Sequence, residues 1–87
     1  MKIIKIEKVT FKEVTYKSTS KDGNVRRKVT FEDPEGKIYN CLTSKNASAS
    51  LDCLNCYLLK RKANIWIHKT QKGNLLIDYC QEIRNNF

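Results

Sequence analysis

The stretch IIKIEKVTFKEVTY, residues 3–16, decides how this chain folds. It is rich in β-branched and aromatic residues and alternates apolar with polar positions, which is typical of a half-buried β-strand. The apolar positions change parity along it: they are even at Ile4, Ile6, Val14 and Tyr16 and odd at Val9 and Phe11. Because successive side chains of a strand point to opposite faces, this change predicts a bend or bulge that lets one strand serve two sides of a curved sheet.

Two hairpins are predicted after this strand. Residues 18–24 form a loop with the turn signal Asp22-Gly23, and an alternating strand from Val25 to Phe31 follows. Asp33-Pro34-Glu35-Gly36 is predicted to form a tight turn, because proline presets the φ angle at its second position and glycine closes it. A third strand is then expected over residues 37–43.

The period of the apolar residues changes in the next segment. Helical spacing, in steps of four, three and four positions, relates Ala47, Leu51, Leu54 and Leu58. Ser50 is a suitable N-cap, and Lys60-Arg61-Lys62 supply cations near the C-terminal end, so a helix is predicted over residues 50–61. Two further strands, residues 63–69 and 75–83, flank a predicted turn at residues 71–74.

This order of elements predicts a mainly β fold, with one domain over residues 1–87. The order is β-β-β-α-β-β, a small five-stranded barrel with one helix between strands three and four. Together with the long bent first strand and the final hairpin at Lys72-Gly73, it resembles the OB-fold, a five-stranded Greek-key barrel. The resemblance covers nearly the whole chain and rests on topology. It implies a binding site on strands two and three and on the loops that join strands one to two and four to five.

The charge balance favours a polyanionic partner. Seventeen Lys and Arg against nine Asp and Glu give the 87-residue chain a formal net charge of +8. This excess is typical of nucleic-acid binders, although basic chains from AT-rich genomes are also rich in lysine. No apolar run approaches the ~20 residues of a membrane helix, and charges interrupt the N-terminus from Lys2 onward. We therefore expect a cytoplasmic protein with reduced cysteines, no signal peptide and no membrane partner.

The sequence contains no convincing catalytic constellation. His68 is the only histidine, and it lies beside Trp66 in a predicted strand, so a nucleophile–base pair would depend on it alone. The three glycines all lie at predicted turns, which excludes a glycine-rich phosphate loop. We expect no enzyme activity, no cofactor and no small-molecule substrate.

The four cysteines leave one alternative open. Cys53 and Cys56 form a Cys-x-x-Cys pair, and with Cys41 and Cys80 four thiolates could hold zinc. A zinc ribbon normally presents two such pairs at turns, whereas this pair lies in a predicted helix and the other two cysteines lie singly in strands. We therefore expect small core or interface residues and no metal, with a zinc-stabilised module as the alternative.

Aromatic side chains set among cations indicate binding of single-stranded nucleic acid, because bases stack on flat rings and cations follow the phosphates. The predicted contacts are Lys17, Lys21, Arg26, Lys28, Tyr39, Trp66, His68, Lys69 and Lys72. Trp66 and His68 share one strand face opposite Ile65 and Ile67, and core packing is the competing interpretation for Trp66. Three other aromatic residues are expected in the core: Tyr16, Phe31 and Tyr79.

The predicted helix is apolar on two sides. Its leucine stripe is expected to pack on the barrel, which would turn the opposite side outward, with Cys53, Cys56, Tyr57 and Leu59. Exposed apolar surface usually marks an interaction site, so this side is predicted to bind a protein partner. The alternative is a helix that is deeply buried or assigned in the wrong register.

Together these features predict a non-enzymatic protein that binds single-stranded DNA, with RNA as the less favoured ligand. We expect it to act as an accessory subunit, with a protein partner, in a replication or recombination assembly of the kind that phages and mobile elements encode. The alternatives are a protein-interaction subunit that grips its partner through the barrel or helix, and an inhibitor of a nucleic-acid enzyme.

Overall fold

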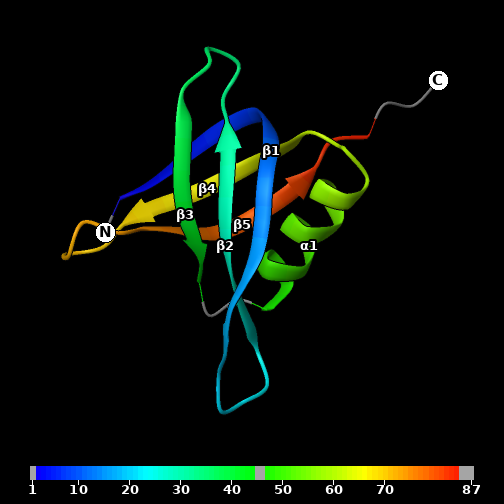
Figure 1. The fold of residues 1–87 in the computed structure, drawn as a ribbon. Helices are drawn as coiled ribbons and strands as arrows, with labels where there is room; N and C mark the ends of the chain where they lie inside the picture. The colour runs from blue at the N-terminus through cyan, green and yellow to red at the C-terminus, as the bar shows by residue number, and fades with distance from the viewer. Residues whose placement is uncertain (1, 45–46, 85–87) are drawn as a thin grey trace.

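The computed structural model describes residues 2–44 and 47–84. Its elements are β1 (Ile3–Thr19), β2 (Val25–Glu32), β3 (Ile38–Thr43), α1 (Ala47–Leu58), β4 (Ala63–Lys69) and β5 (Leu75–Glu82). The strands form a closed barrel in the order β1-β2-β3-β5-β4, and α1 packs against β5, β1 and β2 (Figure 1). The predicted fold class is therefore confirmed: a mainly β, five-stranded barrel whose helix lies between β3 and β4.

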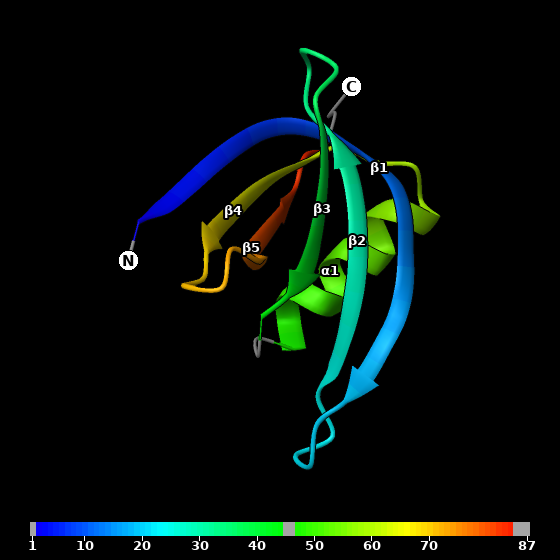
Figure 2. The ribbon, with the colours of Figure 1, turned by 60° about the vertical axis from the view of Figure 1, so that its left-hand side comes forward.

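Strand β1 closes the barrel by pairing along both of its halves. Its first half runs antiparallel to β4, from Ile3 opposite His68 to Val9 opposite Ala63. Its second half runs antiparallel to β2, from Thr10 opposite Glu32 onward. The register shifts between Ile6 and Val9, where Lys8 has a φ of 55°. This bulge is the predicted bend, and the strong curve of β1 is evident in Figure 2.

The barrel interior is filled by side chains from both sides of this bend. The largest fully buried side chains include Val9, Val29, Phe31, Ile65 and Ile77. Phe11 meets Phe31 edge-on, with 6.4 Å between ring centroids. A second register shift between Phe11 and Glu13 explains why the odd position Phe11 and the even position Val14 both face inward.

Two aromatic residues expected in the core lie outside it. Tyr16 is 61% exposed because β1 and β2 continue past the barrel as a two-stranded ribbon that no second layer covers. Tyr79 is 46% exposed because the register shift between Trp66 and Ile67 turns it outward, between the buried Ile77 and Cys80. Only Phe31 of the three is a core residue.

The helix begins and ends three residues earlier than the predicted range of 50–61. Ser50, the expected N-cap, lies inside the helix and is buried. The helix ends in a Schellman turn: the Arg61 amide donates to the Cys56 carbonyl (2.9 Å), and the Lys60 amide donates to the Tyr57 carbonyl (3.3 Å). Lys60 takes the left-handed conformation of this turn, with φ of 56°. Lys60-Arg61-Lys62 therefore follow the helix instead of forming its last turn.

The buried side of α1 differs from the predicted one, although Leu54 of the predicted stripe is half-buried against the core; Tyr57, expected outward, is half-buried against it too. Cys53 and Cys56 were expected to face outward, but they are 0% and 1% exposed. Leu51 and Leu58, expected against the barrel, are 55% and 64% exposed. Small side chains let the helix backbone approach β5 and β1 closely, which bulky leucines would prevent, so packing selects the smaller stripe.

The buried cysteines of α1 gather with Cys80 of β5. Hydrogen bonding to Cys80, together with burial, raises the pKa of the Cys56 thiol, and hydrogen bonding to Cys53, together with burial, raises that of Cys80. Cys41 lies apart on β3, where burial raises its thiol pKa to about 12. Within residues 2–44 and 47–84, no group of three or more His, Cys, Asp or Glu side chains is arranged to hold a metal ion.

We expect all four thiols of the native protein to resist alkylation by iodoacetamide at neutral pH. Burial denies the reagent access to all four thiols, and the raised pKa values of Cys41, Cys56 and Cys80 keep those three protonated, whereas alkylation requires an exposed thiolate. Mass spectrometry should find modification only after denaturation. Rapid native labelling of Cys53 or Cys56 would mean that α1 does not pack in this orientation.

Lys60→Gly should stabilise the protein by about 1 kcal/mol, because glycine adopts the left-handed conformation without the clash that a Cβ creates. The midpoint and slope of urea unfolding measure the change. Leu59→Gly is the matched control: Leu59 has no positive φ, so glycine there should lower stability. A Lys60→Gly protein less stable than the parent would contradict the described helix end.

Candidate nucleic-acid interface

The outer face of β2 and β3 carries a groove of about 390 Å³, which Glu13 and Thr15 of β1 also line. Lys28 is exposed in it and lies opposite Leu42 of β3. Next along the strands, Thr30 donates a hydrogen bond to the Asn40 side-chain oxygen (2.9 Å). The turn between β4 and β5 borders the groove at Gly73-Asn74, so this face and that turn form one continuous surface.

The remaining predicted cations lie on the two loops beside this face. Lys17 and Lys21 are exposed on the β1–β2 hairpin, which extends beyond the barrel at the bottom of Figure 1. Arg26 is half-buried and lines a hollow of that hairpin together with Asp22 and Asn24. Lys69 and Lys72 are exposed at the β4–β5 turn. Six predicted cations thus lie at the surface around the β2–β3 face.

Tyr39 does not present a free ring on this face. It shares the inward parity of the buried Cys41 on β3, and it stacks on Phe31 at 5.0 Å with an interplanar angle of 15°. The Lys37 ammonium lies 4.9 Å from the ring centroid, and the hydroxyl donates to Asp33 (3.3 Å). Inward parity and Phe31 thus occupy part of the half-buried ring, and the predicted stacking contact at Tyr39 stays a prediction.

Trp66 lies on the outside of the barrel, on β4. Its strand neighbours Ile65 and Ile67 are buried, so the alternation turns Trp66 away from the core. Its ring centroid lies 5.0 Å from that of Tyr79, and the Lys5 ammonium lies 5.2 Å from the indole centroid. Lys5 and Tyr79 are the cross-strand partners of Trp66 on β1 and β5. The competing interpretation of Trp66 as core filler is thus not supported.

His68 shares the outer face of β4 with Trp66, as expected, but its ring is engaged. His68 Nδ1 lies 2.6 Å from a carboxylate oxygen of Asp78, and the side chain is only 12% exposed. This arrangement leaves little of the imidazole ring exposed for stacking with a nucleobase. His68 thus links β4 to β5 through Asp78, and its contact with nucleic acid stays a prediction.

The predicted contacts therefore form two groups. One is the cationic β2–β3 face with its loops. The other centres on Trp66, which Tyr79 and Lys5 join in an aromatic cluster on the outer face of β1, β4 and β5. The β4–β5 turn connects them, because it borders the groove and continues into the strands of the cluster. Sequence reasoning missed Lys5 and Tyr79, since only the strand register brings them to Trp66.

Comparison of the chain with protein-family models, with curated proteins and with solved structures finds no match. In the part of the chain that the structure describes, no helix is long and apolar enough to cross a membrane.

Trp66→Ala should leave the protein folded and cost about 1–2 kcal/mol of unfolding free energy, as for loss of a half-buried surface contact. Phe31→Ala should cost about 3–5 kcal/mol, because it empties the centre of the barrel. Urea unfolding of both variants measures the difference. Equal destabilisation by the two substitutions would show that Trp66 is a core residue.

Proposed function

We propose that this chain is a non-enzymatic OB-fold protein that binds single-stranded nucleic acid, DNA in the first instance. The closed five-stranded barrel with its helix between β3 and β4 supports this proposal. OB-folds bind oligonucleotides on strands two and three and on the two loops beside them. The groove, Lys28 and the lysine-bearing loops lie on those same elements here.

The observation that carries the proposal is the aromatic pair on the barrel surface. Trp66 and the half-exposed Tyr79 present rings outside the core, with the Lys5 ammonium beside them. Stacking of a base on an aromatic ring contributes about 1–3 kcal/mol, and it requires a base that is not already stacked in a duplex. This cluster therefore favours a single strand over a double strand.

In the proposed path, one strand follows the groove and crosses the β4–β5 turn to reach the aromatic pair. The four residue steps from Trp66 to Thr70 span about 13 Å of extended chain, so the two surfaces are close enough for one short oligonucleotide. Lys28, Lys69 and Lys72 are placed to meet its phosphates. Lys17, Lys21 and Arg26 extend the positive surface toward the β1–β2 hairpin.

We further propose that the protein works as an accessory subunit of a replication or recombination assembly. The proposed site consists of binding residues alone, which suits a subunit that holds nucleic acid for other proteins. A protein-interaction subunit is the second candidate. It is favoured by the exposed leucines at the end of α1, Leu58 and Leu59, which the nucleic-acid path does not use.

The binding constant for an oligo(dT) should fall linearly with salt on logarithmic scales, with a slope of about −0.7 for each phosphate contacted. Trp66 fluorescence should be quenched on binding, and Trp66→Ala should weaken affinity by about 5- to 100-fold through the lost stacking. Lys28→Gln should make the salt slope less negative by about 0.7. Fluorescence anisotropy of labelled oligonucleotides measures all three effects.

Two control variants separate the site from general charge and folding effects. Trp66→Phe keeps a flat ring and should retain most of the affinity, and Lys37→Gln removes one charge at the β2–β3 turn and should not change the salt slope. Each of three results would refute the proposed function: binding that does not depend on salt, equal affinity for duplex and single-stranded oligonucleotides, or full affinity of the Trp66→Ala variant for oligo(dT).

A further inference from the structure

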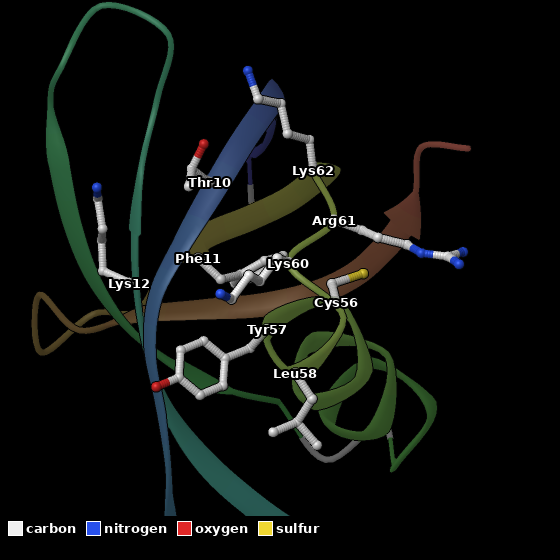
Figure 3. Close-up of a pocket in the computed structure, with 9 residues that line it drawn as sticks. All are labelled: Thr10, Phe11, Lys12, Cys56, Tyr57, Leu58, Lys60, Arg61 and Lys62. Atoms are coloured by element: carbon white, nitrogen blue, oxygen red, sulfur yellow. The ribbon is translucent and has the colours of Figure 1, made fainter. Parts of the chain in front are cut away.

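A second hollow, of about 550 Å³, lies between β1 and the C-terminal end of α1 (Figure 3). Phe11 and Lys12 of β1 form one wall, and Tyr57 and Leu58 of α1 form the other. Lys60 and Lys62, which follow the helix, complete the rim. The hollow is larger than the groove on the β2–β3 face and is built from other parts of the chain.

The floor and one edge of this hollow are apolar. Phe11 and Cys56 are buried at its base, and the half-buried Tyr57 ring extends toward β1 in Figure 3. Leu58 beside it is 64% exposed, and Leu59 is exposed as well. The inverted packing of α1 produces this surface, because small residues occupy the core and leave the leucines outside. Exposed apolar side chains next to a hollow mark a contact site for another molecule.

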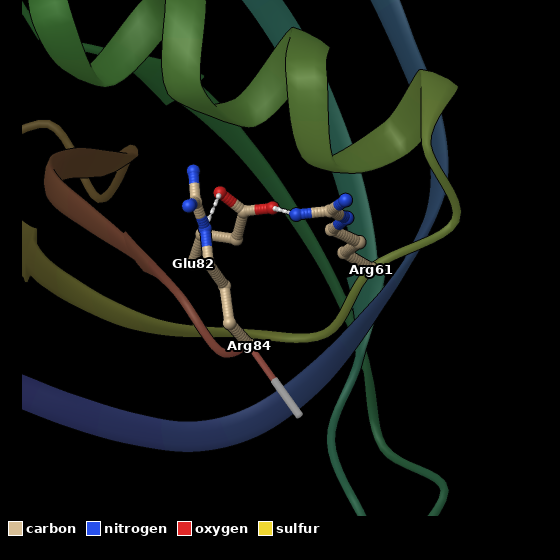
Figure 4. A network of polar contacts seen from close by, with 3 residues as sticks. All are labelled: Arg61, Glu82 and Arg84. Carbon is tan, nitrogen blue, oxygen red and sulfur yellow. Dashed lines mark hydrogen bonds and ion pairs between the residues drawn. The ribbon is translucent and has the colours of Figure 1, made fainter. Parts of the chain in front are cut away.

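The rim of the hollow is positively charged, and none of the described residues that line it is Asp or Glu. Lys12 has one acidic neighbour, Glu32 at 3.6 Å. Arg61 is held by Glu82, which also accepts from Arg84 (Figure 4). These contacts hold the pKa of Glu82 below its ordinary value, Arg61 being the largest cause.

Two rim lysines have no counter-charge. Lys60 and Lys62 form no ion pair within the described residues, 2–44 and 47–84. Figure 3 shows the Lys60 side chain directed toward Phe11 and the Lys62 side chain extending away from Tyr57 and Leu58, whereas Arg61 points away from β1. Lys60 thus offers an ammonium group beside the apolar floor, and Lys62 adds a second positive charge at the rim.

The turn that ends α1 creates this arrangement. Lys60 occupies a left-handed position where glycine would be favoured, and the turn divides three consecutive cations between the two sides of the chain. Backbone strain of this kind clusters at functional sites, where a side chain is needed despite its cost. A glycine would keep the turn but would remove the Lys60 ammonium from the hollow.

We propose that this hollow docks an acidic segment of a partner protein, in which Asp or Glu residues flank a large apolar side chain. The apolar side chain packs on Tyr57, Leu58 and the floor at Phe11. The carboxylates pair with Lys60 and Lys62, and with Lys12 in exchange for Glu32. The apolar floor favours a peptide over a nucleic-acid backbone, because phosphates and sugars have nothing comparable to bury there. This site is independent of the proposed nucleic-acid path.

The test uses the full chain and a fluorescein-labelled peptide in which Asp and Glu surround a central Phe-Leu. Two matched peptides serve as controls. One has Asn and Gln in place of Asp and Glu, and the other has Ser-Ser in place of Phe-Leu. Anisotropy should show binding of the parent peptide alone, weakened by salt. The double variant Lys60→Gly/Lys62→Gln should lose about three- to twentyfold in affinity, as for two exposed ion pairs. Leu58→Ser should lose about tenfold through the missing apolar contact.

The matched control is Lys2→Gln/Lys37→Gln, which removes the same net charge elsewhere and should bind the peptide like the parent. Because Lys60→Gly is expected to stabilise the fold, a loss of binding in the double variant cannot be attributed to unfolding.

The oligo(dT) affinity of the double variant should be unchanged, which separates this site from the proposed function. Any of three results would overturn the proposal. The parent peptide does not bind, the amide peptide binds as tightly as the parent peptide, or the double variant keeps its affinity for the parent peptide. Displacement of the peptide by oligo(dT), with equal loss of both ligands in the double variant, would assign the hollow to nucleic acid instead.

Discussion

The structure depends on one strand that forms hydrogen bonds with two partners. The first half of β1 pairs with β4 and the second half with β2, so closure of the barrel requires the chain to change direction between Ile6 and Val9. Lys8 absorbs this change in a left-handed conformation. Closure encloses the fully buried side chains of Phe31 and Ile65. In so small a protein, the remaining core is modest, and its side chains must pack tightly.

Tight packing also decides what the helix exposes. Cys53 and Cys56 fill the narrow space between α1 and β5, with Cys80 facing them, whereas Leu51 and Leu58 lie outside it. The apolar surface of Leu58 is consequently left outside, next to the turn that distributes Lys60 and its neighbours. The core and the proposed docking surface are thus two results of the same choice of side-chain size.

The two proposed surfaces differ in chemistry because they arise from different elements. Outward alternation on β2 and β4 places Lys28 and Trp66 on the barrel surface, where charge and flat rings suit a single strand. The end of α1 offers aliphatic surface beside Lys60, with Lys62 at the rim, which suits a carboxylate-bearing peptide. A small accessory protein with both surfaces could hold a nucleic acid and a partner at the same time, since neither surface uses the residues of the other.

The sequence by itself determined the order of the elements, the turns, the bend in β1 and the outward position of Trp66. These follow from interactions between near neighbours: strand alternation, turn chemistry and helical spacing act over a few residues. The helix face, the outward position of Tyr79 and the stacking of Tyr39 on Phe31 were decided only by the tertiary structure. Two apolar stripes on α1 have the same period, and the choice between them depends on the space that β1 and β5 leave. Likewise, Trp66 meets Lys5 and Tyr79 because the strand register places them together, and register is a long-range property that no local pattern contains.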